Sequence, residues 1–456
     1  MRVQLRSARE AGKGISSASW HSLRGEGKQG RASLSRGRNG RYPRLVLVVQ
    51  KYGGTSVADA ERIKHVAGRI VRRVRQGDQV VVVVSAMGNT TDELIDLALQ
   101  VTDDPDPREL DMLLSTGEQV SIALVSMALR ALGQEAVSLT GTQAGIYTRP
   151  TYGAGRIIRV DTARIRFELE RGRVPIVAGF QGATEDQEIV TLGRGASDTT
   201  AVALAVALGA ARCENYKDVE GVYTADPRLV PTARRLSEIT YEEMLELATQ
   251  GAQVMHNRAV ELASVHELPI LVTSSFVDAP GTLIHGGPLM EERNRVRAIA
   301  HDTDVAKITI RHVPDRPGIA AQIFEPLAEA GISVDTIVQN ASEANLTDLT
   351  FTVATKDLRR AEALMPAICE AIGAAGYSTD ADLAKVSIVG TGIQTAPGYA
   401  ARMFRTLYEH GINIEMISTS EIRLTCIIKK DRVAEAVRAL HDAFQLESKD
   451  EVQGTG

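Results

Sequence analysis

The sequence predicts an α/β protein: a mainly parallel sheet sandwiched by helices, followed by two smaller ferredoxin-like βαββαβ units. Three observations predict this class. Strand-like apolar runs alternate with helical patterns up to about residue 210. Residues 79–84 hold five consecutive valines, which is typical of a strand buried on both faces of a parallel sheet. The last third of the chain contains an internal repeat, and each copy reads as a split βαβ unit.

Strands and helices follow one another in the order that a parallel sheet requires, with a helical crossover between strands. Residues 56–75 place Ile63, Val66, Ile70 and Val74 on one face, which is the spacing of an amphipathic helix. The other elements that we expect are strands at residues 45–49, 79–84, 136–139 and 175–180 and helices at residues 90–101, 109–132 and 198–208.

The internal repeat lies between residues 307–340 and 385–420, which we call the first and second repeat. Lys307 matches Lys385, the Pro-Gly pair at 317–318 matches the pair at 397–398, and Phe324 matches Phe404. Each copy reads strand, Pro-Gly turn, helix and strand, and a further strand, helix and strand are expected to complete it. Two similar small units beside a larger one indicate regulation, although a role only in assembly fits as well.

Composition bounds the class of protein. The 456 residues are 44% hydrophobic and 24% charged, as in a globular protein of two to four domains. No apolar run approaches the ~20 residues that span a bilayer, so no membrane partner is expected. The cysteines Cys213, Cys369 and Cys426 are widely spaced and odd in number, which fits neither a disulfide framework nor a zinc site. We therefore expect a reducing, cytoplasmic location.

Residues 1–44 differ from the rest of the chain. This arm holds eleven Lys or Arg and two acidic residues, so it carries +9 and the remainder −14 of the net −5. It is rich in Gly, Ser and Arg without apolar periodicity, and it cannot bury enough surface to fold alone. It is a disordered arm, a transit peptide, a nucleic-acid-binding tail or translated upstream DNA with the true start near Leu45. The last reading is favoured, and no nucleic-acid partner is expected.

Three clusters carry candidate chemistry. In LVVQKYGGTSV (residues 47–57) a strand ends on Lys51 beside two glycines, which suits either a plain turn or a phosphate cradle. In TLGRGASDTTAVALAVALGA (191–210) Ser197 or Asp198 is a natural N-cap, and Arg194 between two glycines suggests a guanidinium presented to a carboxylate or phosphate. The third, NYKDVEGVYTADPR (215–228), is a polar loop with two aspartates, a lysine and an arginine.

Competing motifs are missing from the sequence. There is no G-x-x-x-x-G-K-[ST] phosphate loop, and a possible dinucleotide fingerprint at Gly390 and Gly392 has Thr395 in the place of its third glycine. The nine histidines form no H-E-x-x-H pattern, and no serine stands in G-x-S-x-G. These absences argue against common nucleotide, metalloprotease and serine-hydrolase sites.

Taken in order, the motifs QKYGGTSV, LLSTGEQ, QGATEDQEIVTLGRGASDTTA and DVEGVYTADPR resemble those of the aspartate kinases (aspartokinases) of the amino-acid kinase family. The resemblance runs from about Leu45 to the end of the chain, and the two repeats look like the ACT domains of that family. It implies an amino-acid kinase domain at 45–288 and ACT domains at 303–382 and 383–447. The family phosphorylates the side-chain carboxylate of L-aspartate with Mg-ATP, at the entry to lysine, threonine and methionine biosynthesis.

The resemblance also implies roles for single residues. Lys51 and Asp198 are the expected catalytic residues, with Lys51 stabilising the transferring phosphoryl group. Arg194 is expected to clamp the α-carboxylate of aspartate and Glu118 to bind its ammonium. The further substrate residues are Thr91, Gly195, Ala196 and Ser197. The expected nucleotide residues are Lys51, Tyr52, Gly53, Gly54, Ser56, Lys217, Asp218, Tyr223, Asp226, Arg228, Gln253 and Val254.

This sequence departs from the family pattern at three positions. Ala196 replaces a commoner glycine, which would crowd the substrate if the position needed a positive φ. Gln253 stands where the family usually has a lysine near the nucleotide, so ATP affinity or rate could be lower. Asn257 replaces the usual proline of an HPR motif, which we interpret as structural only.

Regulation and assembly follow from the repeats. Lysine, threonine or both are the expected inhibitors, bound at Asp315, Pro317, Gly318, Ile319, Ala320, Gln339, Asn340, Asn413, Ile414 and Ser420. We expect a homo-oligomer or an α2β2 assembly with a short chain from an internal start near Met290, as some family members make. Two rival functions are another amino-acid kinase, of the glutamate 5-kinase or acetylglutamate kinase type, and a non-catalytic amino-acid sensor.

Overall fold

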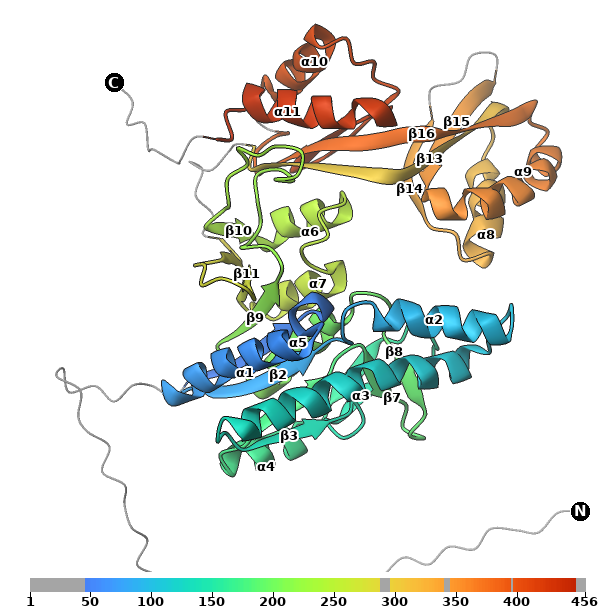
Figure 1. Ribbon diagram of the computed structural model, residues 1–456. Coiled ribbons are helices and arrows are strands. Elements are labelled where there is room, and N and C mark those ends of the chain that lie inside the picture. Colours follow the sequence, from blue (N-terminus) through green and yellow to red (C-terminus); the bar gives the residue numbers. More distant parts are fainter. Residues whose placement is uncertain (1–45, 288–295, 340–344, 395–396, 448–456) are drawn as a thin grey trace, which may run out of the picture. The chain divides into compact units, whose positions relative to one another are not determined.

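The computed structural model describes residues 46–287, 296–339, 345–394 and 397–447. The predicted arm at residues 1–44, the candidate start Met290 and the candidate effector residue Asn340 lie outside the described residues. The described chain forms an eight-stranded sheet, a small four-stranded sheet and a six-stranded sheet (Figure 1).

The eight-stranded sheet is mainly parallel, as predicted. Its order is β10-β12-β11-β9-β1-β2-β6-β3, and among its neighbouring pairs only β11 and β12 run antiparallel. Its strands are β1 (Leu47–Tyr52), β2 (Gln79–Val84), β3 (Ala136–Leu139), β6 (Val174–Ala178), β9 (Arg212–Lys217), β10 (Glu238–Thr240), β11 (Ile270–Ser274) and β12 (Thr282–His285).

Helices cover both faces of this sheet, which explains its apolar strands. In β2, Val80, Val82 and Val84 pack with one set of helices, while Val81 and Val83 pack with the other. The first set is α1 (Ala60–Arg75) and α3 (Pro107–Ala131), on which α2 (Thr90–Val101) lies. The second set is α4 (Ala163–Glu170), α5 (Ser197–Leu208), α6 (Tyr241–Thr249) and α7 (Asn257–Val265).

The four-stranded sheet was not predicted. Its order is β5-β4-β7-β8, from strands of three or four residues: β4 (Ile146–Thr148), β5 (Ile157–Val160), β7 (Gln181–Ala183) and β8 (Ile189–Thr191). Segments this short show no alternation that a sequence pattern could detect. The sheet carries the chain from β6 to the glycine loop before α5.

Element boundaries differ from the predictions for local reasons. The expected helix over 56–75 is split into a 3₁₀ turn (Gly54–Val57) and α1, because Asp59 caps α1 by accepting from the Arg62 amide. The expected strand over 175–180 ends at Ala178, and Phe180 has a φ of 66°, which no strand accommodates.

Helix α3 passes a length and composition test for a membrane span. Half of its most apolar window is buried in the structure, where Ile122, Val125 and Leu129 pack with β2 and α1. It is the core helix of this face of the sheet.

The six-stranded sheet contains both repeats. Its antiparallel order is β14-β15-β13-β16-β18-β17, from β13 (Ala298–Pro314), β14 (Val334–Gln339), β15 (Leu346–Val353), β16 (Gly376–Val389), β17 (Met416–Ser420) and β18 (Arg423–Lys429). Helices α8 (Ile319–Glu329) and α9 (Leu358–Ile372) pack on the first repeat, and α10 (Tyr399–Glu409) and α11 (Val433–Ala443) on the second.

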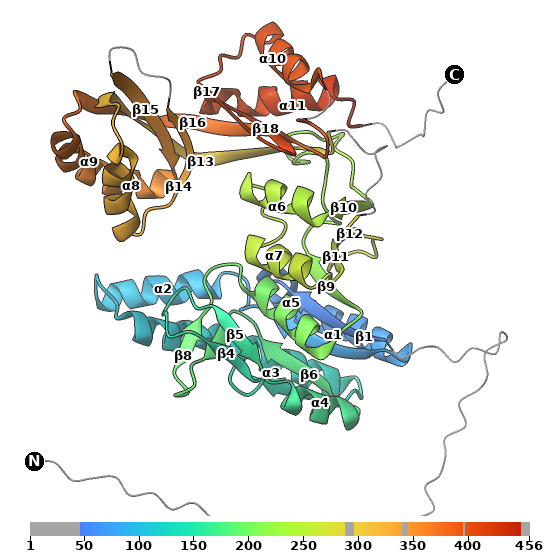
Figure 2. The same cartoon turned by 180° about the vertical axis from the view of Figure 1, so that it is seen from behind.

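Strands β13 and β16 run through both halves of this sheet (Figures 1 and 2). The later part of β13 pairs with β15 and the first half of β16, within the first repeat. Its earlier part, residues 298–302, pairs with residues 385–389 of the second repeat. The outer strand of the second repeat therefore precedes the first repeat in sequence, rather than following α11 as a simple βαββαβ order would have it.

Candidate active site

The candidate site lies at the carboxyl ends of the parallel strands β1 and β9. Lys51 and Lys217 project there toward the start of α5, where Asp198 lies. Lys51 Nζ is 2.7 Å from Asp198 Oδ1, and Lys217 Nζ is 2.9 Å from Oδ2. The Lys51 and Asp198 side chains are only 6% and 3% exposed. Two cations on one carboxylate leave a surplus positive charge, which suits the binding of an anion.

The ionisation of this trio follows from burial and charge. Burial lowers the pKa of Lys51 from 10.5 to about 8, with Lys217 adding to the shift and Asp198 opposing it. Burial alone would raise the pKa of Asp198, but the two ammonium groups outweigh it and hold that pKa well below its usual range. At neutral pH, Asp198 is therefore ionised and Lys51 is mostly protonated.

The glycine turn after β1 is tied to the neighbouring strands. The Gly54 carbonyl accepts from the Gly88 amide at 3.1 Å, and a Cβ on Gly54 would lie 2.8 Å from the Ala86 carbonyl oxygen. The Ser56 hydroxyl donates to Ser275 Oγ at 2.9 Å, and Ser275 Oγ donates to the Lys217 carbonyl at 3.0 Å. Gly54 is thus required by a close backbone approach, and the turn is linked to the end of β9.

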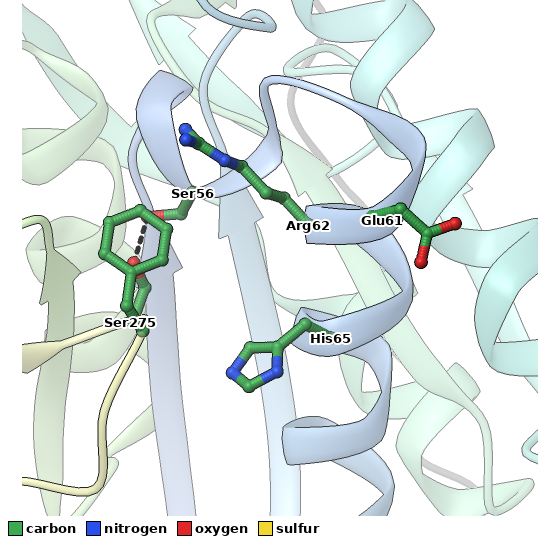
Figure 3. A pocket seen from close by; sticks show the side chains of 6 residues that line it. Ser56, Glu61, Arg62, His65 and Ser275 are labelled. Atoms are coloured by element: carbon green, nitrogen blue, oxygen red, sulfur yellow. Dashed lines mark hydrogen bonds between the residues drawn. The ribbon is translucent and has the colours of Figure 1, made fainter.

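A pocket of about 220 Å³ lies beside this turn, on the α1 side (Figure 3). Its lining residues are Ser56, Glu61, Arg62, His65, Ser275 and Phe276. Figure 3 shows the Ser56–Ser275 hydrogen bond at one end and Glu61 pointing away from it. The guanidinium carbon of Arg62 lies 5.1 Å from the centre of the Phe276 ring. Lys51 and Asp198 do not line this pocket, so it adjoins the lysine site without containing it.

Glu118 is an unusual buried carboxylate in the middle of α3. Its side chain accepts from the Ala86 amide at 3.1 Å, and its second oxygen has no hydrogen-bond partner among the described residues. Burial raises the pKa of Glu118 to about 8, against the lowering effect of the Ala86 amide. A buried acid with an open oxygen is a suitable partner for an incoming ammonium group.

The glycine loop before α5 presents Arg194 to solvent. Gly193 and Gly195 have φ values of 88° and 76°, which explains the two glycines. Arg194 is 70% exposed and lies 2.5 Å from the carboxylate of Asp92, in the first turn of α2 beside the half-buried Thr91. The Arg194–Asp92 ion pair therefore holds the glycine loop close to the first turn of α2, which contains Thr91.

The predicted side-chain N-cap of α5 is wrong. The N-cap residue is Ala196, with φ −74° and no side-chain cap, because Asp198 is engaged by the two lysines. Ala196 is buried in an ordinary right-handed conformation, so its methyl group causes no backbone strain. Ser197 packs against Gly179, where an added Cβ would lie 2.6 Å from the Ser197 hydroxyl oxygen.

In the predicted nucleotide loop after β9, Tyr223, Asp226 and Arg228 form their described side-chain bonds and strand bridge with one another or with Arg235, and not with Lys51 or Asp198. The guanidinium of Arg228 donates to both carboxylate oxygens of Asp226, with Arg228 Nη2 2.7 Å from Asp226 Oδ2, and the arginine side chain is 87% exposed. Asp218 is exposed. The pKa of Arg228 is raised mainly by its hydrogen bonds to Asp226 and by the charge of Asp226, and the charge of Asp218 adds a smaller effect. Tyr223 forms a backbone bridge with Arg235. The other two predicted nucleotide residues are the exposed Gln253 and the partly buried Val254 before α7.

Sequence reasoning missed two residues of the lysine site. The His256 amide donates to Asp198 Oδ2 at 3.4 Å. The His256 ring lies against Gly195, where an added Cβ would be 2.8 Å from its Cδ2 atom. Ser275 joins Ser56 to Lys217, as described above. The signal for Ser275 was its place directly after the buried strand β11, at the edge of the sheet where β1 and β9 also end.

The predicted effector residues lie at the start of α8, at the ends of β14 and β17 and just before β17. Asp315 and Pro317 are exposed before α8, and Gly318 caps that helix with a φ of 91°. Gln339 is the exposed last residue of β14. In the second repeat, Ser420 ends β17, and its hydroxyl donates to Glu246 of α6 at 2.9 Å. The remaining positions are Ile319 and Ala320 in the first turn of α8 and Asn413 and Ile414 before β17.

Comparisons with known proteins agree with this architecture. Residues 46–274 match the model of the amino acid kinase family, and residues 308–373 and 386–444 match models of the ACT domain. The aspartokinase of Mycolicibacterium smegmatis is 49% identical over 90% of this chain and 100% of its own length. That of Geobacillus stearothermophilus is 51% identical over 88% and 97%.

Solved structures give the same result. E. coli aspartokinase III in complex with aspartate and ADP is similar with a TM-score of 0.73 and 26% identity, over 88% of this chain and 100% of that one. The same enzyme in complex with lysine and aspartate has a TM-score of 0.68, also at 26% identity, over 87% and 99%. The matched family models and these likenesses over whole chains show that the chain belongs to the aspartokinases, amino-acid kinases with two C-terminal ACT domains.

Proposed function

We infer that this chain is an ATP-dependent aspartate kinase. It transfers the γ-phosphoryl group of ATP to the β-carboxylate of L-aspartate and gives 4-phospho-L-aspartate and ADP, the first step toward lysine, threonine and methionine. The observation that supports this most directly is the pair of lysines on buried Asp198 at the ends of β1 and β9. The aspartokinase relatives and the aspartate–ADP complex of the E. coli enzyme support the choice of acceptor and nucleotide.

The chemistry needs charge neutralisation rather than a base. The acceptor carboxylate has an unperturbed pKa of ~3.9, so it is already a nucleophile at neutral pH. It must attack a phosphoryl group that is itself negative, and positioned cations lower that repulsion. Lys51 and Lys217 supply two such cations, and Asp198 fixes both ammonium groups toward one point. We assign Lys51 to the transferring phosphoryl group and Asp198 to its orientation.

The nucleotide would be held on either side of the lysines. Gly53, Gly54 and Ser56 form the turn after β1, and we assign this turn to the phosphates. The Ser56 hydroxyl would exchange its bond to Ser275 Oγ for one to the nucleotide. Arg228, exposed and paired with Asp226, is free at its outer edge to meet a phosphate. The other assigned positions are Lys217, Asp218, Tyr223, Gln253 and Val254, together with Tyr52, whose side chain is fully buried and which would act through its backbone.

Aspartate would be held by groups of opposite charge. Glu118, with its open oxygen, would receive the ammonium, and Arg194 would leave Asp92 to clamp the α-carboxylate. The exposed Asp92 pair is weak enough to exchange, because solvent-exposed ion pairs are worth ~0–1 kcal/mol. We assign Thr91, Gly195, Ala196 and Ser197 to the rest of the aspartate site.

Mg²⁺ would enter as part of the substrate Mg-ATP. Asp198, a carboxylate at the proposed phosphate position, already carries two lysine ammonium groups, whose positive charges would repel a metal ion. Magnesium in kinases is commonly held by substrate phosphates and water together with few protein groups. We therefore assign no protein ligand to the ion.

The test is a coupled assay of ADP release with aspartate, glutamate or N-acetylglutamate as acceptor. Aspartate-dependent ADP release with little from the other two acids is the expected result. Preference for glutamate or N-acetylglutamate would favour another amino-acid kinase, and no turnover with any acceptor would favour a non-catalytic sensor. Retention of Lys51, Glu118, Arg194 and Asp198 argues against the sensor.

We also propose feedback inhibition by lysine, threonine or both through the repeats. Helix α8 begins beside Asp315, so its N-terminal amides would favour the carboxylate of an amino acid while Asp315 pairs with its ammonium. The lysine complex of the E. coli enzyme supports this choice of effector class. Coupling of ~1–3 kcal/mol would change apparent substrate affinity roughly 5–150-fold.

Activity against inhibitor concentration, for wild type and Asp315→Ala, tests this proposal. The substitution should relieve inhibition and leave uninhibited turnover nearly unchanged, because Asp315 is exposed in the turn before α8 and outside the lysine site. A wild-type enzyme indifferent to millimolar lysine plus threonine would leave the repeats with a role in assembly only.

For assembly we propose a homo-oligomer or an α2β2 complex in which a short chain starts at Met290. Mass spectrometry of natively expressed protein should find that fragment, and only the long chain, with proteolysis excluded, would contradict the α2β2 form. We propose the domain division at 45–288, 303–382 and 383–447, with residues 298–302 joining the sheet of the second repeat. The proposed location is the cytoplasm.

A further inference from the structure

A buried polar cluster lies behind the two lysines, on the opposite face of β1 and β9. The strands pair in register, so Gln50 lies beside Glu214 and Tyr52 beside Tyr216. Gln50 Nε2 donates to Glu214 Oε2 at 2.9 Å, and the Tyr216 hydroxyl donates to the same oxygen at 3.0 Å. The Tyr52 hydroxyl donates to Gln50 Oε1 at 3.2 Å. The four side chains form one connected network across two strands.

Ring stacking and arginines reinforce this network. The rings of Tyr52 and Tyr216 stack with centroids 4.6 Å apart and planes 7° apart. Arg212 donates twice to Glu214 Oε1, at 2.8 and 2.6 Å. Burial would raise the pKa of Glu214, but hydrogen bonds from Gln50 and Arg212 together with the charge of Arg212 hold it below the usual value. The carboxylate at the centre of the network therefore stays ionised.

Helix α1 connects the network to the loop that caps Lys217. The guanidinium carbon of Arg69 lies 5.1 Å from the centre of the Tyr216 ring, and its Nη1 donates to the carbonyls of Ser275 and Val277 at 3.4 and 3.3 Å. The Ser275 amide in turn donates to the Lys217 carbonyl at 2.8 Å. Arg69 therefore contacts Tyr216 directly and is linked through Ser275 to Lys217, and these are the last two residues of β9.

Packing alone does not require polar groups here. The neighbouring strand β2 fills the same face with Val80, Val82 and Val84, all buried. Burying a carboxylate, an amide and two phenols is costly unless every partner is met, and once met it fixes a geometry that apolar side chains leave adjustable. The network also sits one residue from each lysine: Tyr52 follows Lys51, and Tyr216 precedes Lys217.

We propose that Gln50, Tyr52, Glu214 and Tyr216 are positioning residues that fix the separation of Lys51 and Lys217 across Asp198. The proposal rests on the proposed function of these two lysines in phosphoryl transfer. The network would act on the lysines through the strand backbone, because side chains of successive residues point to opposite faces of a sheet. A displacement of ~1 Å at a site of this kind can lower the rate up to 10²-fold.

The first test is steady-state kinetics of Tyr216→Phe, which keeps the ring and its stacking and removes only the hydroxyl. We expect kcat to fall roughly 10-fold while the KM values for Mg-ATP and aspartate stay within about twofold, because misplacement affects the reacting geometry rather than uniform binding. Tyr52→Phe should act in the same direction, and the double variant should cost less than the product of the two single effects.

The matched control is Tyr241→Phe, which removes another buried tyrosine hydroxyl. Tyr241 lies in α6 at 3% exposure, and its hydroxyl has no hydrogen-bond partner among the described residues. Its kcat should equal that of the wild type. If Tyr216→Phe lowers the melting temperature but keeps wild-type kcat, the network is only structural and the proposal is wrong.

A second readout does not need activity. The rate at which acetic anhydride modifies Lys51, followed by mass spectrometry of its peptide against pH, reports the neutral fraction of this amine. The wild-type midpoint should lie near pH 8. In Tyr216→Phe it should rise by roughly 0.5 unit, a threefold change in neutral amine, because Lys217 is no longer held beside Lys51.

The two proposals fail in distinguishable ways. Wild-type protein that releases no ADP with aspartate would overturn the proposed function, and the labelling midpoints would still decide whether the network positions the lysines. Active wild type with unchanged kcat and unchanged midpoint in Tyr216→Phe would overturn the network alone.

Discussion

Each carboxylate oxygen of Asp198 forms an ion pair with a different lysine, so the two lysines can be tested separately. Lys51 is the more buried cation and holds the carboxylate at 2.7 Å. For Lys51→Ala we expect kcat to fall by about 10²–10³, as for loss of one preorganised charge-stabilising donor, with a smaller change in KM. The control is Lys64→Ala, an exposed lysine paired with Glu61 on α1. Near-normal turnover of Lys51→Ala in the ADP-release assay would refute the phosphoryl role.

Arg194 differs from Lys51 because it is exposed and its proposed contact is with a part of aspartate that does not react. For Arg194→Ala we expect the KM for aspartate to rise strongly, since a bidentate clamp is lost, while kcat changes less. Initial rates over a range of aspartate concentrations at saturating Mg-ATP measure this. A loss confined to kcat would place Arg194 at the phosphoryl group instead.

Glu118 should make aspartate binding depend on pH. Its pKa of about 8 means that it is neutral at pH 7 and ionised above pH 8 in the free protein. The substrate ammonium favours the ionised form, so the KM for aspartate should fall as pH rises from 6.5 to 8. Binding at pH 7 should also release close to one proton, which calorimetry in two buffers of different ionisation enthalpy detects.

Glu118→Gln is the matched variant for this pH dependence, since it keeps the shape and cannot ionise. It should bind aspartate weakly and lose the fall in KM between pH 6.5 and 8. Above pH 8, kcat/KM should decline for a different reason. Lys51, whose pKa is also about 8, loses its positive charge there. If Glu118→Gln keeps the wild-type KM profile, another group controls the pH response.

At the level of elements, the glycine turn after β1 joins two loops through a close approach. A Cβ on Gly54 would lie 2.8 Å from the Ala86 oxygen and 3.0 Å from the Gly88 oxygen, both backbone atoms. Gly54→Ala should therefore destabilise the fold by about 1–3 kcal/mol, as overpacking does, measured by urea unfolding. Gly68→Ala in α1 is the control, because no atom lies within 4 Å of its added Cβ and it should stabilise slightly. Equal stability of both variants would contradict the close approach.

The sequence could predict those elements whose pattern is local. The valines of β2 and the apolar stripe of α1 identified buried strands and an amphipathic helix, and the amino-acid kinase and ACT assignments are confirmed by the family models. The predicted side-chain cap of α5 was wrong because Asp198 pairs with Lys51 and Lys217, which the pairing of β1 with β9 brings together. The outer strand at residues 298–302 could not be predicted, since its partner lies some 85 residues later. Roles of single site residues stay predictions until kinetics test them.

Over the whole molecule, the internal repeat produces a reciprocal pair of ion pairs. Lys307 lies 3.0 Å from Glu415, and Lys385 contacts Asp335. Lys307 and Lys385 are equivalent, and Asp335 and Glu415 occupy equivalent places in ISVD and INIE. Each repeat therefore offers a lysine to the acid of the other, as two subunits do across a twofold axis.

Charge reversal tests whether these pairs hold the repeats together. Lys307→Glu should destabilise the protein by about 1 kcal/mol through repulsion from Glu415, and the double variant Lys307→Glu/Glu415→Lys should recover most of that loss. The measurement is a double-mutant cycle of urea unfolding. Two independent, additive losses would show that the pair contributes nothing. The pKa of Glu415 is lowered mainly by Lys307, so this contribution is present above the ordinary pKa of 4.5 and lost as pH falls through the lower folded value.

The strands shared by the repeats set where the chain can be divided. A polypeptide beginning at residue 303 would lack the segment 298–302 that borders β16, and the second half of its sheet would end in bare amide and carbonyl groups of residues 385–389. A polypeptide beginning at Met290 would keep every strand of both halves. A fragment that contains both complete repeats must therefore start upstream of Ala298. Shorter fragments should expose the unpaired edge of β16 and aggregate.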